Sequence, residues 1–174
     1  MIFFTLSIAL YKYSYIEFLR IFLNNKYIKN GNNNYLPLHY IVLTMKSSLI
    51  ASCGMNCGIC RGHLRKKKKC PGCRGSNENK SFSCVNCKLK ICNDLNMNNL
   101  KFCFQCDKFP CEGIKQMDKR YRTKYNMSTI ENLENIKKFG LPEFVKNEKI
   151  RWACSKCGET ICVHIGYCDN CGKQ

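Results

Sequence analysis

The chain has 174 residues, sixteen cysteines and a formal charge of +17. This length leaves room for one ordinary domain or two small ones, and it excludes an enzyme built on a large barrel. Cysteine makes up about nine per cent of the residues, a level at which disulfides or metal ions replace part of an apolar core.

Residues 1–44 differ in composition from the rest of the chain. They contain no cysteine and ten of the twenty aromatic residues. The apolar run Ile2–Leu10 is too short to cross a bilayer, which takes about 20 residues, and it lacks the flanks of a signal peptide. One interpretation is a helix that lies on a membrane surface. We favour a second interpretation, in which residues 1–44 are an extension unlike the rest of the chain and translation begins at Met45.

Six Cys-x-x-Cys pairs dominate the remaining sequence. Two thiolates three residues apart can hold one ion from a single tight turn, here called a knuckle, whereas disulfides gain most by closing longer loops. The repeated spacing therefore favours metal sites in a reducing compartment over a disulfide scaffold. We expect two to three zinc ions and a cytoplasmic location. The pairs are Cys57/Cys60, Cys70/Cys73, Cys84/Cys87, Cys103/Cys106, Cys154/Cys157 and Cys168/Cys171.

The first cluster has the spacing C-x3-C-x2-C at Cys53, Cys57 and Cys60. Enzymes that cleave S-adenosylmethionine hold a [4Fe–4S] cluster with the same spacing, but they surround it with a large partial barrel for which this chain has no room. We therefore predict the beginning of a structural zinc site, completed by a distant cysteine or by His63. An iron–sulfur cluster with a redox or radical function is the alternative.

A run of five cations, Arg65–Lys69, follows this cluster. A solvated loop is the simpler interpretation, and a phosphate-binding patch is the alternative. The next pair, Cys70 and Cys73, encloses Pro71 and Gly72, which favour a tight turn that directs both sulfurs to one point. A loop sequence follows this pair, which argues against a redox-active motif.

The ligand framework continues to Cys111, where Pro110 rigidifies the approach of the last thiol. Eleven cysteines between residues 53 and 111 are enough for two four-ligand sites with three left over, but the spacing does not group them. We expect loops and knuckles here, with a short helix at Asp94–Leu100. The predicted metal ligands in this second half of the block are Cys84, Cys87, Cys92, Cys103, Cys106 and Cys111.

The order of three motifs, CGMNCGIC, CPGCRG and FCFQCDKFPCEGIKQMDKRYRTKYNMS, resembles a family of small cysteine-rich microbial proteins. That family is catalogued only as a domain of unknown function. The resemblance covers about Ser52 to Ile136 and extends to the C-terminal knuckles. It implies a metal-binding domain, with zinc as the expected ion, and it implies no activity. Family members have fewer cysteines at the first knuckle pairs, so the resemblance does not group Cys70 and Cys84.

Three helices are predicted after the cysteine block. Glu112–Tyr125 carries apolar residues on one stripe, at Ile114, Met117 and Tyr121. Its cations near the C-terminal end are explained by the helix dipole without any ligand.

Ser128 and Glu131 form a capping box that begins the next helix. This helix has an apolar face and ends at Gly140, and Pro142 begins a further short helix. The apolar face consists of Ile130, Leu133, Ile136 and Phe139.

Residues 151–174 have the pattern of a zinc ribbon. Cys154, Cys157, Cys168 and Cys171 form two knuckles, each followed by glycine, and a β-hairpin between them would set the four sulfurs tetrahedrally around one ion. Cys162 and His164 lie between the knuckles, two apart on the expected strand. They could extend a site, but packing is the simpler role.

Together these features predict a small metal-stabilised α+β protein: a cysteine-rich knuckle domain with two to three short helices and a C-terminal zinc-ribbon hairpin. The expected divisions are an extension at 1–44, a metal-binding domain at 45–127, a helical connector at 128–150 and the ribbon at 151–174. We find no catalytic constellation and no transmembrane segment, so the sequence favours a non-catalytic interaction module. The basic charge suits nucleic acid or an acidic protein as partner; zinc sites with twelve thiolates would leave it at about +11.

Overall fold

The computed structural model describes residues 27–29, 35–37 and 45–172 of the chain. Two compact units are present, Met1–Thr44 and Met45–Gln174. In the first unit, strands β1 (Tyr27–Lys29) and β2 (Tyr35–Pro37) pair antiparallel, with Ile28 opposite Leu36. The predicted apolar run at 2–10 lies outside the described residues. None of the described helices has the length and apolar character needed to cross a membrane.

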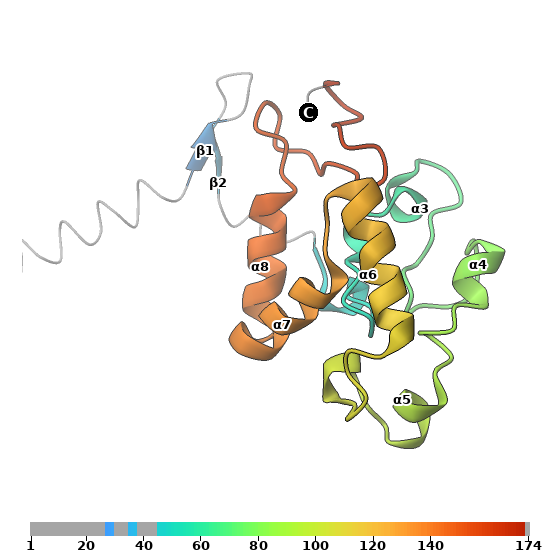
Figure 1. Cartoon of the computed structure of the whole chain (residues 1–174). Helices are drawn as coiled ribbons and strands as arrows, with labels where there is room; N and C mark the ends of the chain where they lie inside the picture. Colours follow the sequence, from blue (N-terminus) through green and yellow to red (C-terminus); the bar gives the residue numbers. More distant parts are fainter. Residues whose placement is uncertain (1–26, 30–34, 38–44, 173–174) are drawn as a thin grey trace, which may run out of the picture. The chain divides into compact units, whose positions relative to one another are not determined.

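The second unit is built from helices joined by long loops (Figure 1). Short helices occupy the cysteine block because its many knuckles, glycines and polar loops leave no room for longer elements. Three longer helices follow it. In chain order the elements are η1 (Ser47–Leu49), η2 (Cys57–Ile59), α3 (Arg61–Leu64), α4 (Phe82–Val85), α5 (Asn93–Met97), η3 (Cys103–Gln105), α6 (Glu112–Tyr125), α7 (Thr129–Phe139) and α8 (Leu141–Arg151).

Helix α6 has the bounds that its apolar stripe predicts. Ile114 is fully buried and Tyr121 nearly so, while Met117 packs at the edge of the core. The helix ends at Asn126, which adopts the left-handed conformation with φ 48° that asparagine tolerates better than most residues. The single stripe is therefore enough to place this helix on the core.

Helix α7 begins after Ser128, whose hydroxyl oxygen accepts the backbone N–H of Glu131 at 3.0 Å. The buried carboxylate of Asp118, from α6, completes the cap. It accepts the backbone N–H of Ile130 at 3.0 Å and the hydroxyl of Ser128 at 2.7 Å, and its second oxygen pairs with Arg122 at 2.6 Å. Residues of α6 thus fix where α7 begins and tie the two helices together.

Helix α8 begins after Gly140, which has φ 82°, and carries Pro142 in its first turn as predicted. It buries Phe144 and Val145 against the core. Phe139, the last residue of the predicted apolar face of α7, is 52% exposed, and its ring lies under the ammonium of Lys138. Only the first three apolar residues of that face reach the core before the chain turns at Gly140.

The segment Ser52–Ile59, around the first knuckle, is the centre of the second unit. Its side chains and backbone are almost wholly buried, so its polar groups need partners from the protein. Four distant parts of the chain supply them. The backbone N–H of Cys103 donates to Ser52 O, the Asn132 amide to Gly54 O, and the backbone N–H of Val163 to Ile59 O, all at 2.9 Å. The side chain of Asn56 donates to Glu148 at 3.0 Å.

The β-hairpin predicted for the ribbon is not found among the described residues. Only an isolated bridge, Ala153 with Thr160, joins the two arms. Beyond it the chain leaves its partner arm, because Val163 hydrogen-bonds to Ile59 of the first knuckle instead. Cys162 and His164 therefore lie in a turn and not on a strand. The described part of the second unit is helical, with more short helices than the two to three predicted.

We predict that Asp118→Asn lowers the free energy of unfolding by about 1–3 kcal/mol at neutral pH, because an amide cannot accept all the hydrogen bonds that the carboxylate accepts. Burial acts to raise the pKa of Asp118, but hydrogen bonds from Ile130, Ser128 and Arg122 hold it below its usual value. A lowered pKa stabilises the fold above the unfolded-state value and ceases to do so as pH falls through the folded-state value.

Urea denaturation from pH 7 down to pH 3 measures both effects. The difference between wild type and Asp118→Asn should narrow below about pH 4. Glu134→Gln, an exposed substitution on α7, is the matched control and should change little. A constant difference across the pH range would contradict the proposed role of the carboxylate.

Candidate metal centre

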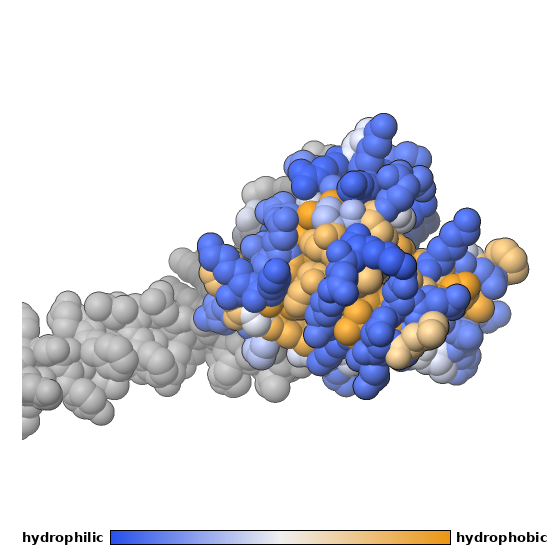
Figure 2. All heavy atoms as spheres, turned by 60° about the horizontal axis from the view of Figure 1, so that its bottom comes forward, coloured by the Kyte–Doolittle hydropathy of each residue, from blue (hydrophilic) through white to orange (hydrophobic). Residues whose placement is uncertain are grey.

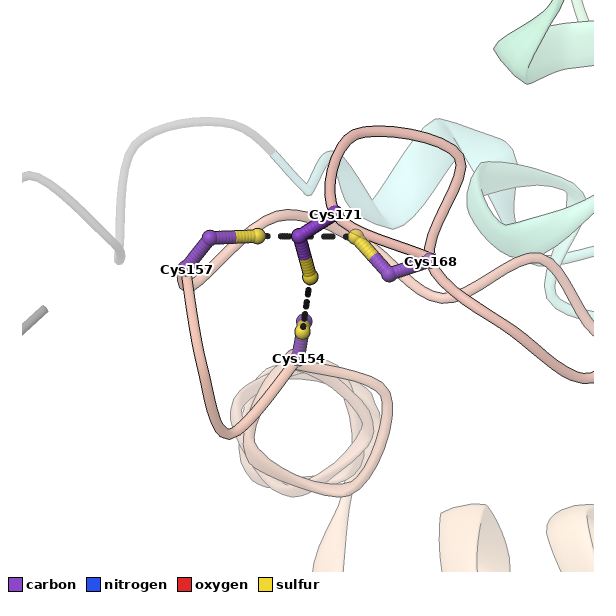
Figure 3. Close-up of side chains that lie close together, drawn as sticks. All are labelled: Cys154, Cys157, Cys168 and Cys171. Carbon is purple, nitrogen blue, oxygen red and sulfur yellow. Dashed lines mark hydrogen bonds between the residues drawn. The ribbon is translucent and has the colours of Figure 1, made fainter. Parts of the chain in front are cut away.

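Four sulfur atoms gather at the C-terminal end of the second unit. The sulfurs of Cys154, Cys157, Cys168 and Cys171 all lie within 4.8 Å of one another. Cys154 and Cys171 are 3.4 Å apart, as are Cys157 and Cys168 (Figure 3). Figure 3 shows the four side chains pointing to a common centre from the two knuckles. These are the residues that the sequence pattern groups into one site.

The two knuckles have the same local geometry. In each, the backbone N–H of the glycine after the second cysteine donates to the carbonyl of the first, for Gly158 to Cys154 and for Gly172 to Cys168, both at 2.8 Å. Both glycines have positive φ, 76° and 70°, a conformation that side-chain-bearing residues rarely adopt. The Cys-x-x-Cys-Gly sequence therefore folds each knuckle so that both of its sulfurs point to the same side.

The spacing of the sulfurs fits one tetrahedral metal ion. Zinc binds thiolate at about 2.3 Å, so the edges of a four-sulfur tetrahedron are about 3.8 Å long. The observed sulfur distances of 3.4 Å, and the upper limit of 4.8 Å for all pairs, lie around that value. The donor set of four thiols suits zinc or iron. The group is thus a possible four-cysteine metal site.

The thiols of this group influence one another's ionisation. Burial acts to raise the pKa of Cys154, but backbone N–H groups of Lys156 and Cys157 and the neighbouring thiols lower it to about 6. Burial, and then hydrogen bonds with the thiols of Cys157 and Cys171, raise the pKa of Cys168 to about 12. The opposite pKa shifts of Cys154 and Cys168 mean that these two thiols resist ionising together. A bound cation would remove this resistance.

Of the two surplus residues of the ribbon, Cys162 is buried and His164 packs against α6. His164 lies edge-on to Tyr125 with ring centroids 4.9 Å apart. The Nδ1 atom of His164 accepts the backbone N–H of Arg61 at 3.4 Å, and its Nε2 atom lies 3.2 Å from the hydroxyl of Tyr121. These contacts attach the ribbon to α6 and to the first knuckle.

In the cysteine block the structure brings the first two knuckles, Cys57/Cys60 and Cys70/Cys73, together. Cys73 lies against Cys57, whose sulfur accepts the backbone N–H of Cys73 at 3.3 Å. Their contact raises the pKa of Cys57 and, with nearby cations, lowers that of Cys73 to about 6. Cys60 and Cys70 are held near each other, because the backbone N–H of Cys70 donates to the carbonyl of Gly62 at 2.8 Å, two residues after Cys60. Segments from both sides of the basic loop thus meet.

The same pairing explains a glycine of the second knuckle. Gly72 has φ 89°, and a Cβ atom there would lie 2.9 Å from the side chain of Leu49 and 3.5 Å from the Cβ of Cys57. Only glycine lets the second knuckle approach the first this closely. His63 does not join this contact, since its Nδ1 atom hydrogen-bonds the carbonyl of Cys70 at 2.8 Å.

The other predicted ligands of the block stay ungrouped. Burial, and then the thiols of Cys111, Cys92 and Cys106, raise the pKa of Cys103 to about 12, so these four lie within electrostatic range of one another. Within residues 45–172, however, only the ribbon thiols form a set of three or more within ligand distance. The predicted ligands outside that set are Cys53, Cys57, Cys60, Cys70, Cys73, Cys84, Cys87, Cys92, Cys103, Cys106 and Cys111, and their metal role stays a prediction.

Sequence reasoning missed two residues that hold the first knuckle. The fully buried side chain of Asn56 accepts the backbone N–H of Gly58 at 2.9 Å and donates to Glu148. Burial raises the pKa of Glu148, and the Asn56 amide acts against this rise. The asparagine stands between two cysteines of a short motif, which is a usable signal. Nothing in the sequence around Glu148, on α8, indicates that it contacts the knuckle.

Comparison with known proteins finds one family whose model is similar to part of this unit. Residues 49–116 match the family model described as Protein of unknown function (DUF3795). The match covers the cysteine block and ends within α6, before the four-sulfur group. The resemblance to a cysteine-rich domain of unknown function is confirmed for this segment. No curated protein and no solved structure matches the chain.

We predict that Cys168→Ser lowers the metal content by about one equivalent per chain, because an open three-thiolate set holds the ion much more weakly than a closed four-thiolate set. Elemental analysis of the dialysed protein measures this. Cys162→Ala is the matched control, since that thiol is buried in the same ribbon outside the four-sulfur group. Equal metal content in wild type and Cys168→Ser would contradict the site.

Proposed function

We propose that this protein is a zinc-stabilised, non-catalytic interaction module. The observation that carries the proposal is the group of four ribbon sulfurs, each within 4.8 Å of the others. A site closed by four thiolates has no open position for a substrate or an activated water, which is the usual arrangement of structural zinc. On this proposal the ion holds the ribbon together, and the surface of the folded chain provides the function.

Sulfur spacing supports zinc over an iron–sulfur cluster at the ribbon. The thiolates around a polynuclear cluster are divided among its iron atoms, and the cluster holds sulfurs on different irons apart, whereas the thiolates around one ion all share it. The limit of 4.8 Å, which holds for every sulfur pair of the group, suits a single shared ion. We extend the proposal to one or two further zinc ions in the cysteine block, where Cys57 and Cys73 already meet. The repeated Cys-x-x-Cys spacing favours thiolate–metal sites, which supports a reducing, cytoplasmic location.

We assign a separate role to each of the predicted segments. Residues 45–127 would carry the partner surface and 151–174 the closed zinc site, with 128–150 as the helical connector. Charge supports an acidic partner, either nucleic acid or protein, because the chain carries 29 cationic residues against 12 acidic ones.

Elemental analysis with a visible spectrum distinguishes zinc from the iron–sulfur alternative. We predict a colourless protein with two to three equivalents of zinc when it is purified anaerobically. A brown protein with broad absorption and stoichiometric iron would instead support a redox or radical cluster at Cys53, Cys57 and Cys60.

Metal removal tests whether the ion stabilises the fold. Structural zinc contributes about 10–16 kcal/mol of apparent binding free energy in small zinc domains. We therefore predict that a strong chelator abolishes the cooperative thermal transition seen by circular dichroism, and that added zinc restores it. An unchanged melting curve after verified removal of the metal would contradict the proposal.

A further inference from the structure

The basic loop Arg65–Lys69 is pinned to the loop that precedes α4. The guanidinium of Arg65 donates to Lys68 O at 2.7 Å and to Asn79 O at 2.6 Å. Lys68 has φ 48°, so the loop curls back at this point. The four lysines that follow Arg65 are exposed. These hydrogen bonds of Arg65 therefore fix the loop, and its lysine ammonium groups lie beside residues 77–82.

Two further lysines converge next to this loop. The Nζ atom of Lys90 donates to Asn77 Oδ1 at 2.7 Å, and that of Lys80 reaches the same oxygen at 3.5 Å and Gly75 O at 2.7 Å. Among the described residues, no ion pair neutralises Lys80, Lys90 or Arg65. Carbonyl and amide oxygens accept the hydrogen bonds of these cations, and no carboxylate in the described part of the chain pairs with them.

The local sequence adds little negative charge. Residues 61–101 contain eleven lysines and arginines but only two acids, Glu78 and Asp94. Asp94 is paired with Lys108 at 2.9 Å. We call the surface formed by 65–69, 77–82 and 88–91 the basic platform. Its positive potential favours an anionic partner.

The basic platform includes one exposed aromatic residue, Phe82. Phe82 is 84% exposed, and it lies three residues after Asn79, the anchor of the basic loop. Figure 2 shows apolar side chains projecting between hydrophilic ones on the side of α4. An exposed phenylalanine that follows Lys80 by two residues and Asn79 by three gains nothing from the core of its own protein. It is the combination that single-stranded nucleic acid requires: cations for the phosphates and a ring for a base.

We propose that the basic platform binds single-stranded nucleic acid, with its lysines along the phosphates and a base stacked on Phe82. This inference rests on the proposed interaction module and names its partner. A duplex would offer the lysines its phosphates but would keep its bases stacked away from the ring. An anionic membrane would require several large apolar side chains to insert together, whereas those exposed on the platform are Phe82 and Ile91. The exposed Met97 belongs to α5, a helix that lies apart from α4 in Figure 1.

The knuckles of the cysteine block frame the platform. Its loops run between Cys60 and Cys92, and the carbonyl of Cys73 accepts a hydrogen bond from Lys80 at 3.1 Å. Folding of the knuckles therefore positions the cations before a ligand arrives. Pre-organised cations bind a flexible strand at a lower entropic cost than mobile ones do.

Fluorescence anisotropy of the full-length, metal-loaded protein with labelled oligo-uridine and oligo-thymidine tests the proposal. Phe82→Ala should weaken binding about 5- to 100-fold, the usual range for loss of one stacked base. Phe139→Ala is the matched control, because that ring is also exposed but lies on α7, and it should leave the affinity unchanged. Equal losses in both variants would contradict the assignment to the platform.

Salt dependence tests the phosphate contacts separately. Replacing Lys66, Lys67 and Lys69 together by alanine should reduce the slope of log K against log salt by about 2, because each phosphate contact on a single strand contributes about 0.7. Replacing Lys119, Lys137 and Lys138, which are exposed on α6 and α7, is the control and should leave the slope unchanged.

Three outcomes would overturn the inference. The first is no binding to either oligonucleotide at low salt. The second is equal affinity for duplex and single strand with no effect of Phe82→Ala. The third is flotation with phosphatidylserine vesicles that depends on Phe82 in the absence of oligonucleotide binding. In each case, zinc content and chelator-induced unfolding would still report independently on the proposed zinc-stabilised module.

Discussion

Mutual repulsion of the ribbon thiolates is the constraint on which the metal assignment depends. Two unit charges 4 Å apart repel by about 1 kcal/mol in bulk water and by about 4 kcal/mol near a protein surface. Four thiolates within 4.8 Å of one another form six such pairs. The chain nevertheless directs all four sulfurs to one point, using two knuckles of the same geometry. Only a shared cation turns this crowding into a stabilising interaction.

The segment around the first knuckle connects the ribbon to the helices of the second unit. Its buried backbone accepts hydrogen bonds from η3, α7 and the ribbon, and Asn56 joins it to Glu148 of α8. Helix α8 leads directly into Cys154, so one rigid element connects the knuckle with the four-sulfur group. The ribbon returns through Val163, which donates to Ile59. The predicted connector at 128–150 therefore also contributes two polar side chains to the hub of the fold.

Local patterns predicted much of this fold, and long-range contacts account for the rest. The apolar stripe of α6, the Ser128 cap and the four ribbon cysteines each depend on residues close in sequence, and the structure contains all three. The predicted ribbon hairpin is not found because Val163 hydrogen-bonds to Ile59, about a hundred residues away in the sequence. No local sequence pattern encodes such a contact. The contacts of Asp118 and Glu148 escaped prediction for the same reason. Ligand grouping in the cysteine block depends on how loops approach in space, which spacing alone does not give.

X-ray absorption at the metal edge tests the central claim most directly, because it reports the ion and its neighbours without depending on stability. The account predicts a zinc edge with a first shell of sulfur at about 2.3 Å and no metal–metal scattering. Cys168→Ser should lower the sulfur count at the affected site, whereas Cys162→Ala should not. An iron edge with iron–iron scattering, or a shell dominated by oxygen and nitrogen, would contradict the account.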